Sequence, residues 1–444
     1  MARQRADALL SAFRDRQATV AVIGLGYVGL PLVKAVVEAG FTGIGIDIDP
    51  DKIRMLHEGV AYLRHFDPAY FAGRIAEGRL ACTTDFSAVA GADAIVICVP
   101  TPLTKHREPD LSYVANTARS IVPHLRKDQL VVLESTTYPG TTQDLLVPAL
   151  EQSGLKSGTD FFVAFSPERE DPGNPDYGTQ SIPKVVGGAD PVALELAVAL
   201  YDQIVVKTVP VSSTAAAEAV KITENIFRAV NIALVNELKL IYGAMGIDVW
   251  EVIDAAKTKP FGFMPFYPGP GLGGHCIPID PFYLTWKARE FDMSTRLVEL
   301  AGEINTAMPG HVVTVCMEAL NARFAKGLKG GRVLLVGLAY KKNVGDIRES
   351  PGLTLIRLLE ERGAKVDYLD PHVPQITMTR EHPEYAGRGS VAADASFAGY
   401  DLTLIATDHD AVDYARLVSE SRLVVDTRNV CERKGVSSAN VVKA

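Results

Sequence analysis

A glycine-rich turn near the N-terminus is the feature that most constrains the fold of this chain. The apolar segment Thr19–Ile23 is followed by Gly24-Leu-Gly26-Tyr-Val-Gly29 and then by a helical pattern, and a second apolar segment ends at Asp47. Glycines at this spacing also occur in ordinary turns. Here a strand precedes them, a helix follows, and an acid lies about 20 residues further on, as in a dinucleotide-binding unit. The sequence therefore predicts an α/β fold.

The same turn predicts which dinucleotide binds. The first amides of the following helix can hold a pyrophosphate, and a carboxylate at the end of the second strand can pair with ribose hydroxyls. Asp47 would repel the 2′-phosphate of NADP, so the expected cofactor is NAD. The turn residues predicted to bind it, together with this acid, are Gly24, Gly26, Tyr27, Val28, Gly29 and Asp47.

Further patterns extend this unit into three regions. Apolar segments at 94–98, 130–133 and 161–164 alternate with helical stretches, which favours a doubly wound parallel sheet. Residues 215–245 contain no proline and one glycine, so they are expected to form one long helix. The predicted architecture is two Rossmann-like doubly wound domains joined by a central helical domain, with the boundaries 1–211, 212–315 and 316–444.

The C-terminal domain begins with an echo of the first turn. The strand pattern Arg332–Val336 leads into Gly337-Leu-Ala-Tyr-Lys341-Lys342, without the three glycines. Two lysines stand where the first turn allows close approach of backbone amides. This difference indicates that the second turn binds another phosphate ligand.

Charge and composition argue against several classes of protein. The net charge of −8 disfavours a general nucleic-acid or anionic-membrane surface, because either needs a basic face. The N-terminal residues lack the apolar core of a signal peptide, and no run reaches the roughly 18 apolar residues of a membrane span. We expect a cytoplasmic protein with neither a nucleic-acid nor a membrane partner.

The cysteines and histidines do not indicate a metal or disulfide framework. Five scattered cysteines contain no Cys-x-x-Cys pair, and nine histidines show no metal-binding spacing, so no metal is predicted. Cys82, Cys98 and Cys316 are interpreted as small buried apolar side chains. Cys276 differs, because it lies in the loop Gly269–Pro281, where backbone amides can lower a thiol pKa and stabilise an oxyanion. Context alone leaves a nucleophile and a structural cysteine equally open.

The long helix supplies two further candidates. Lys221 and Asn225 are four residues apart and share one helix face. They can form a solvated helix edge, or they can form a pair that binds an oxyanion. The spacing does not decide between these interpretations.

Over nearly its whole length the chain resembles the UDP-glucose/GDP-mannose dehydrogenase family, in particular the UDP-N-acetylglucosamine 6-dehydrogenase branch. Order and spacing both agree. The matching segments are GLGYVGLPL (24–32), CVPTPL (98–103), ESTTYPGTT (134–142), SPEREDPGN (166–174), KITENIFRAVNIALVNEL (221–238), GPGLGGHCIPIDP (269–281) and GLAYKKNVGDIRESP (337–351).

The resemblance implies a reaction and the residues that perform it. The C6 hydroxymethyl of a UDP-sugar would be oxidised to a carboxylate in two hydride transfers to NAD, through a thiohemiacetal and a thioester on Cys276. Lys221 and Asn225 would stabilise the oxyanions, and Asp280 would act as base or water-orienting acid. Glu168 and Thr136 would support substrate and water.

The resemblance also implies binding residues and an assembly. Lys341 and Arg428 match positions that contact UDP, and Lys52 matches a basic residue near the cofactor ribose. The central helix would form a homodimer. The further positions implied in the cofactor and substrate sites are Thr101, Thr136, Glu168, Arg169, Lys221, Asn225, Tyr267 and Gly273.

Two departures from the family pattern bear on the substrate. Relatives that use UDP-glucose carry Pro-Glu-Phe-Leu and a second glutamate where this chain has Pro167-Glu168-Arg169-Glu170-Asp171. They also place an arginine before the cysteine loop, where this chain has Lys257-Thr-Lys259-Pro260. The expected substrate is UDP-N-acetylglucosamine, followed by its manno and galacto epimers and then UDP-glucose. The uronic acid would serve surface-polysaccharide biosynthesis.

Three other functions remain open from the sequence. A single-step β-hydroxyacid or sugar-phosphate dehydrogenase shares the first domain but needs neither the loop cysteine nor the third domain. A cysteine hydrolase would need an oriented base, and the adjacent His275 cannot easily turn back onto Cys276. A nucleotide sensor without catalytic activity is the alternative from a different class.

Overall fold

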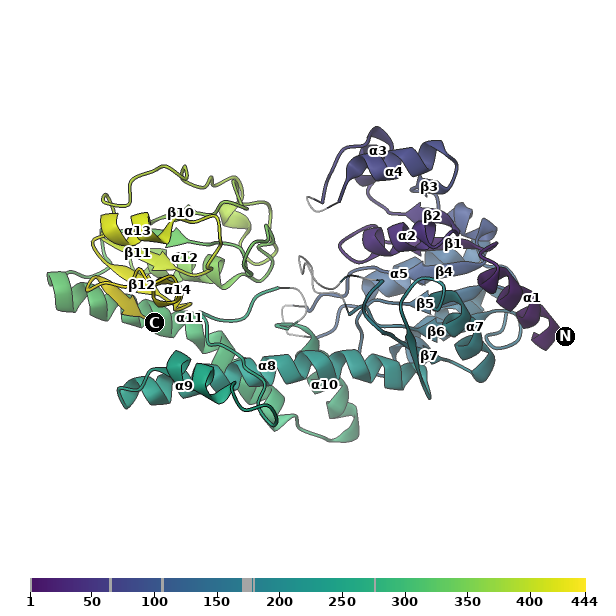
Figure 1. The fold of residues 1–444 in the computed structure, drawn as a ribbon. Helices are drawn as coiled ribbons and strands as arrows, with labels where there is room; N and C mark the ends of the chain where they lie inside the picture. Colours follow the sequence, from purple (N-terminus) through teal and green to yellow (C-terminus); the bar gives the residue numbers. More distant parts are fainter. Residues whose placement is uncertain (1, 64–65, 105–107, 170–177, 179, 275–276) are drawn as a thin grey trace. The chain divides into compact units, whose positions relative to one another are not determined.

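The structure, a computed structural model, describes residues 2–63, 66–104, 108–169, 178, 180–274 and 277–444. They divide into two compact units: unit 1 is Met1–Glu224 with Phe282–Met293, and unit 2 is Asn225–Pro281 with Ser294–Ala444 (Figure 1). Each unit contains one Rossmann-like sheet, and long helices form the central region, which confirms the predicted fold class. The division into three domains stays a prediction.

Unit 1 is built on an eight-stranded sheet in the order β3-β2-β1-β4-β5-β6-β7-β8. Neighbouring strands are parallel, as expected for a doubly wound sheet, except β6 and β7, which are antiparallel. A parallel neighbour needs a crossover, whereas the described residues between β6 and β7 contain no helix. The strands are β1 Thr19–Ile23, β2 Thr42–Ile46, β3 Leu80–Thr83, β4 Ala94–Ile97, β5 Leu130–Leu133, β6 Phe162–Phe165, β7 Lys184–Gly188 and β8 Thr208–Val211.

Helices cover both faces of this sheet, so β1 and β4 are apolar on both sides. Ala21 and Ile97 pack on the side of α5, whereas Val20 and Val96 pack on the side of α1 and α2. Both layers are buried. The helices of unit 1 are α1 Ala2–Arg14, α2 Gly29–Glu38, α3 Pro50–Glu58, α4 Pro68–Ala76, α5 Ser112–Ile121, α6 Val147–Leu150 and α7 Pro191–Tyr201.

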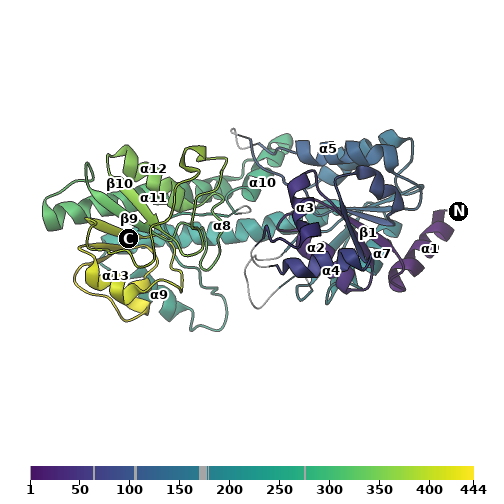
Figure 2. The same cartoon turned by 90° about the horizontal axis from the view of Figure 1, so that it is seen from above.

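Unit 2 contains a five-stranded parallel sheet in the order β10-β9-β11-β12-β13. Helices α11 and α12 pack together against one face, as Figure 2 shows, and α13 and α14 pack against the other. The strands are β9 Arg332–Val336, β10 Lys365–Leu369, β11 Leu402–Ile405, β12 Val424–Asp426 and β13 Val441–Lys443, and the helices are α9 Val249–Ala256, α11 Arg296–Phe324, α12 Pro351–Glu361, α13 Tyr414–Glu420 and α14 Val430–Arg433.

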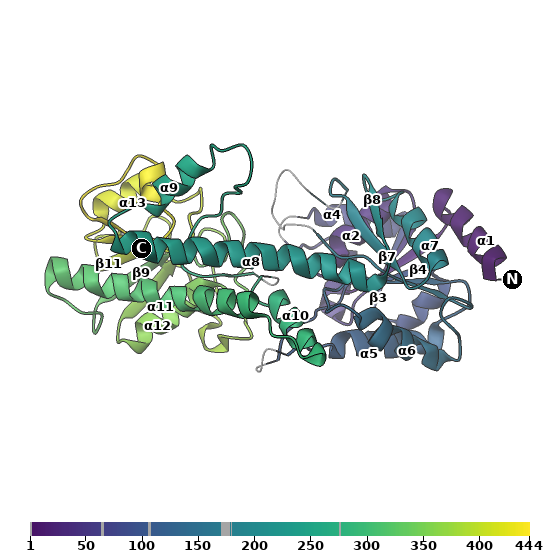
Figure 3. The ribbon, with the colours of Figure 1, turned by 90° about the horizontal axis from the view of Figure 1, so that it is seen from below.

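The long helix predicted at 215–245 is confirmed as α8, Thr214–Ala244, which is unbroken in Figure 3. A second helix, α10, spans Asp280–Ala288. Within unit 2, α8 runs beside α11, and two buried amides join them: Asn236 Nδ2 donates to Asn305 Oδ1 at 2.9 Å, and Asn305 Nδ2 donates to the Ala229 carbonyl at 3.0 Å. This pairing fixes the register of the two helices. No helix in the described part of the chain has the length and apolar character to cross a membrane.

Candidate functional site

The first glycine turn has the shape that a bound dinucleotide requires. Gly24 has a φ of 94°, and a Cβ there would lie 2.5 Å from the carbonyl oxygen of Cys98 at the end of β4. A Cβ at Gly29 would lie 1.9 Å from the Gly24 carbonyl oxygen, so neither position tolerates a side chain. A Cβ at Gly26 would meet nothing within 4 Å. The open side of the turn is therefore at Gly26, where a phosphate can approach the backbone.

Asp47 is fixed against this turn. Its buried carboxylate accepts hydrogen bonds from the Leu25 amide at 2.8 Å and from the Asp49 amide at 3.0 Å. Lys52 Nζ donates to the same carboxylate at 3.0 Å. The structure thus places the two predicted ribose-site residues, Asp47 and Lys52, in contact.

The other predicted cofactor residues lie on the turn or near the ends of β4 and β5. Tyr27 and Val28 are half-buried within the turn, and Thr136 is half-buried in the segment after β5. Thr101 is buried, and its carbonyl accepts a hydrogen bond from the Tyr283 hydroxyl. In the sheet order β2-β1-β4-β5 the connections change direction between β1 and β4, which is where ligands bind in open α/β sheets.

Glu168 contacts a buried cluster of charges that the sequence did not reveal. Lys184 Nζ, at the start of β7, lies 3.6 Å from Glu168 Oε2 and 3.0 Å from Glu134 Oε2. Burial lowers the pKa of the Lys184 ammonium, but the two carboxylates outweigh this effect and raise the pKa above its ordinary value. Lys184 therefore remains charged and orients Glu168.

Arg169 follows Glu168 but binds elsewhere. Its guanidinium forms an ion pair with Glu224 of α8, with the shortest contact at 2.5 Å, and donates to the Pro183 carbonyl at 2.7 Å. The contacts made by Arg169 therefore fix the segment after β6 against α8.

The two helix residues, Lys221 and Asn225, are both buried. Asn225 Nδ2 donates to Asp280 Oδ2 at 2.5 Å, and Asp280 is 2% exposed. Burial argues against a solvated helix edge, which was one of the two interpretations left open. The Asn225 hydrogen bond also joins two residues that the family resemblance had assigned to the reaction.

Glu218, which the sequence did not single out, lies one turn before Lys221 on α8. Its fully buried carboxylate accepts hydrogen bonds from the Gly140 amide at 2.6 Å, the Thr142 amide at 2.9 Å and the Thr142 hydroxyl at 2.7 Å. Burial raises its pKa to about 7. Glu218 fastens the ESTTYPGTT segment, which contains Thr136, to α8.

The glycine loop before Cys276 packs on the C-terminal sheet. Cys276 and His275 themselves lie outside the described residues. A Cβ at Gly269 would lie 2.6 Å from Arg428 Nη1, and a Cβ at Gly273 would lie 2.5 Å from Tyr340 Cβ. At Gly273 only glycine permits this approach, whereas at Gly269 the Arg428 side chain would have to move. The loop therefore lies directly against the predicted UDP-binding residue Arg428 and beside the half-buried Lys341.

Tyr267, predicted to bind substrate, belongs to a surface cluster. Its hydroxyl donates to Asp254 Oδ1 at 2.7 Å and accepts from Lys257 Nζ at 3.1 Å. The remaining cysteines agree with their predicted role, since Cys82, Cys98 and Cys316 are buried.

Comparisons with known families match the chain in three successive parts. Residues 18–205 match the NAD binding domain of the UDP-glucose/GDP-mannose dehydrogenase family. Residues 215–307 match its central domain, and residues 334–433 match its UDP binding domain.

Individual relatives agree with these matches. The chain is 40% identical to a UDP-N-acetyl-D-glucosamine 6-dehydrogenase of Pseudomonas aeruginosa, over 80% of this chain and 83% of that protein. It is 33% identical to an NDP-N-acetyl-D-galactosaminuronic acid dehydrogenase of Ralstonia nicotianae, over 95% and 98%. The solved structure of a UDP-D-ManNAc dehydrogenase from Pyrococcus horikoshii has a TM-score of 0.85 at 31% identity and covers 96% of this chain and 98% of that one. The chain belongs to the UDP-glucose/GDP-mannose dehydrogenase family and is an NAD-dependent nucleotide-sugar dehydrogenase.

Proposed function

We propose that this dehydrogenase oxidises the C6 hydroxymethyl of UDP-N-acetylglucosamine to the uronic acid, using Cys276 as a covalent nucleophile. NAD supplies the hydride acceptor for both oxidations. The Cys276 thiolate adds to the aldehyde carbon to give a thiohemiacetal. Loss of the second hydride leaves a thioester, which water hydrolyses.

The observation that carries this proposal is the position of the glycine loop. The loop that leads to Cys276 lies against Arg428, with a separation of 2.6 Å from a Cβ built on Gly269 to the guanidinium. Arg428 belongs to the UDP binding domain. If its guanidinium holds a phosphate, the sugar of the same ligand extends toward the loop. Lys341, next to Tyr340, is the second proposed UDP contact.

The proposed oxyanion groups are Lys221 and Asn225. Both are buried, so their donors act where the effective dielectric constant is low. Loss of one such donor typically lowers the rate by about 100- to 1000-fold. The contact between Asn225 and Asp280 supports a role for Asp280 as the base or water-orienting acid. We assign Glu168 and Thr136 to substrate and water, with Glu168 oriented by Lys184.

The choice of substrate rests on similarity and on two residues. The relative that is 40% identical acts on UDP-N-acetyl-D-glucosamine, whereas other relatives are named for the manno and galacto forms. An acetamido group needs a hydrogen-bond partner, and we propose Arg169 or the loop before Cys276. A site built for that amide would leave polar groups unpaired with glucose and discriminate strongly against it.

The test is a comparison of kcat/KM for UDP-N-acetylglucosamine, its manno and galacto epimers, and UDP-glucose, with NADH counted against sugar consumed. We expect two NADH per sugar and the highest value for UDP-N-acetylglucosamine. A preference for UDP-glucose would contradict the substrate. One NADH per sugar would indicate a single-step dehydrogenase, and binding without NADH formation would indicate a sensor.

A pair of cysteine variants tests the covalent step. We expect Cys276→Ala to abolish acid formation. Cys316→Ala is the matched control, because Cys316 is buried in α11 and is not one of the predicted site residues, and it should retain activity. Full activity in the Cys276 variant would exclude the thiohemiacetal.

We also propose a cytoplasmic homodimer that forms through the central helix and serves surface-polysaccharide biosynthesis. Large apolar side chains of α8 are exposed in unit 2, including Phe227, Leu234 and Ile241. Such a stripe is typical of a protein–protein interface. Light scattering after gel filtration should give the mass of a dimer, and Leu234→Glu should shift it toward the monomer.

A further inference from the structure

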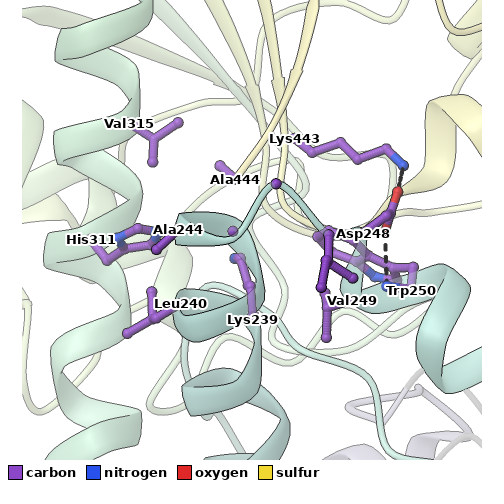
Figure 4. A pocket seen from close by; sticks show the side chains of 13 residues that line it. Lys239, Leu240, Ala244, Asp248, Val249, Trp250, His311, Val315, Lys443 and Ala444 are labelled. Carbon is purple, nitrogen blue, oxygen red and sulfur yellow. Dashed lines mark hydrogen bonds and ion pairs between the residues drawn. The ribbon is translucent and has the colours of Figure 1, made fainter.

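Unit 2 contains a cavity whose lining includes Lys239, a residue on which the charge of Arg428 acts. The cavity has a volume of about 440 Å³ and is lined by the C-terminal end of α8, the start of α9, the middle of α11 and strand β13 (Figure 4). None of the predicted catalytic, cofactor or substrate residues lines it. Its size is within the range of pockets that bind small molecules.

The unusual group in this cavity is Lys239. It extends from α8 between His311 on one side and Trp250 on the other, as Figure 4 shows. Only 7% of the residue is exposed, and its Nζ has no hydrogen-bond partner among the described residues. The centroid of the Trp250 ring lies 5.7 Å from Nζ. An ammonium that is buried without a hydrogen-bond partner is costly.

The pKa of Lys239 reflects this environment. Burial and, to a smaller extent, the charge of Arg428 lower the pKa to about 7, although the charge of Asp426 acts in the opposite direction. An anion placed against Nζ would restore the protonated form.

No other charged group in the described part of the chain forms a hydrogen bond with Lys239 Nζ. Asp248 forms an ion pair with Lys443 and accepts a hydrogen bond from the Trp250 amide at 2.8 Å. Lys443 also pairs with Glu432. Burial, followed by the charge of Lys239, lowers the pKa of His311, so its imidazole is neutral at pH 7. One positive group, Lys239, is therefore left for a ligand.

The remaining walls are apolar. Leu240, Ile247, Val249 and Val315 line the cavity, and the Trp250 ring offers a flat face. Phosphate carries up to two charges and several oxygens, and most of them would face these hydrocarbon side chains without hydrogen bonds. A carboxylate has one charge, which one ammonium can neutralise. The cavity is also larger than a carboxylate alone and leaves room for an apolar body.

We propose that this cavity is a second ligand site, which binds a small organic monocarboxylate with its carboxylate on Lys239 and its apolar body on Trp250. The ligand would join α8 and α11 to the C-terminal strand β13, so binding should stabilise unit 2. The same helix carries Asn225, 14 residues earlier.

Benzoate is a suitable probe, because it combines one carboxylate with a flat apolar ring. The experiment is calorimetric titration of the full chain at pH 7.5, with NADH and UDP at saturation so that their sites are occupied. We expect benzoate to bind and to raise the unfolding temperature. Benzamide, which has the same shape without the charge, and inorganic phosphate should each bind at least about tenfold more weakly.

The matched variants are Lys239→Met and Lys326→Met. Methionine keeps the length of Lys239 and removes the buried amine, so this variant should fold at least as well as the wild type and lose at least about tenfold in benzoate affinity. Lys326 is exposed and pairs with Asp401, away from the cavity, so its variant should bind as the wild type does. Unchanged affinity in Lys239→Met would overturn the proposal.

A measurement on the wild type alone supports or contradicts the same conclusion. Titrations in two buffers of different ionisation enthalpy report protons taken up on binding. At pH 7.5 the free amine is mostly neutral, so benzoate should bind with uptake of part of a proton. No heat with benzoate, no proton uptake, or tighter binding of phosphate than of benzoate would each refute the site.

Discussion

The two Rossmann-like sheets begin with the same turn and then diverge. Gly24 follows β1 with a φ of 94°, and Gly337 follows β9 with a φ of 83°. A Cβ on Gly24 would lie 2.5 Å from the Cys98 carbonyl oxygen, and a Cβ on Gly337 would lie 2.1 Å from that of Thr407. In unit 1 the turn therefore packs against the end of β4, and in unit 2 it packs against the end of β11. In each sheet this strand is the neighbour of the first strand across the point where the connections change direction.

An aspartate holds each turn from the opposite side. The Leu25 amide donates to Asp47 at 2.8 Å, and the Leu338 amide donates to Asp370 at 2.7 Å. The other groups that bind the two carboxylates differ. Asp47 pairs with Lys52, which is partly exposed, whereas Asp370 binds buried His409 at 3.0 Å and a second turn amide. These hydrogen-bond partners of the Asp370 carboxylate all belong to the protein itself.

The segments after the turns differ most. In unit 1, α2 begins at Gly29, so the first amides of a helix face the open side of the turn. In unit 2, α12 begins only at Pro351, and residues 338–350 intervene with Lys341 and Lys342. One turn thus offers backbone amides and the other offers side-chain cations. The same strand and turn geometry can therefore bind two different phosphate ligands, because the residues after the turn are different.

Substituting the two turn glycines should have the largest effect. Gly24→Ala and Gly337→Ala each place a Cβ on a carbonyl oxygen, at a φ that non-glycine residues rarely adopt. We expect Gly24→Ala to weaken NADH binding by about 100-fold or more with UDP binding retained, and Gly337→Ala to do the reverse. Calorimetry with each ligand, after a check of folding by circular dichroism, measures both. Equal loss of both ligands in either variant would show that the two turns do not act separately.

The next prediction uses two buried groups of α8 whose pKa values both lie near 7. Burial raises the pKa of Glu218 to this value and lowers the pKa of Lys239 to it. Glu218 has a pKa of about 7 in the folded unit 1 and 4.5 as its ordinary value. Between these values the unfolded chain loses a proton that the folded unit keeps, so unit 1 should lose roughly 3 kcal/mol of stability from pH 4.5 to 7. Lys239 has a pKa of about 7 when folded and 10.5 ordinarily, so unit 2 should gain stability from pH 7 to 10.5.

The two tryptophans allow these effects to be measured separately, because Trp286 belongs to unit 1 and Trp250 to unit 2. Urea unfolding of Trp250→Phe reports unit 1 by fluorescence, and that of Trp286→Phe reports unit 2. Glu218→Gln should remove the loss of stability with pH that the unit 1 reporter shows. Lys239→Met should remove the gain of stability with pH that the unit 2 reporter shows. Identical pH dependence for both reporters would contradict the assignment of each group to its unit.

The sequence predicted the parts of this comparison whose signal is local. β1, β9 and α8 are continuous apolar or helical patterns, and Gly24 and Asp47 follow from a fixed spacing. Contacts between distant residues were not predictable. Glu218 meets Thr142 across 76 positions and Lys184 meets Glu134 across 50, and a lone acid or lysine gives no pattern that identifies its partner. Strand β7 was missed because it begins with a buried lysine.

The third prediction concerns the two aspartates. Asp47→Ala removes the repulsion of a 2′-phosphate and releases Lys52, so the preference for NAD over NADP should narrow by about 10- to 100-fold. Asp370→Asn should leave cofactor preference unchanged and destabilise unit 2 by about 1–3 kcal/mol, because a buried acceptor of several hydrogen bonds is lost. kcat/KM for the two cofactors and urea unfolding measure these effects. Equal use of NAD and NADP by the unmutated protein would show that Asp47 does not contact the ribose.

The smallest effect should separate the two lysines of the second turn. Lys342 Nζ lies 2.7 Å from Asp410, which also accepts a hydrogen bond from Asn343, so its charge is already neutralised on the surface. Exposed pairs of this kind contribute about 0.2–1 kcal/mol, and Lys342→Ala should change UDP affinity by less than about threefold.

Lys341, the proposed phosphate contact, lies beside Tyr340, on which Gly273 packs. Lys341→Ala should weaken UDP binding by about tenfold or more, because a charge-assisted hydrogen bond to phosphate is lost. Both variants should bind NADH as the wild type does. If Lys342→Ala proves the more damaging, the phosphate is bound by the other lysine, and the surface pair with Asp410 opens when UDP binds.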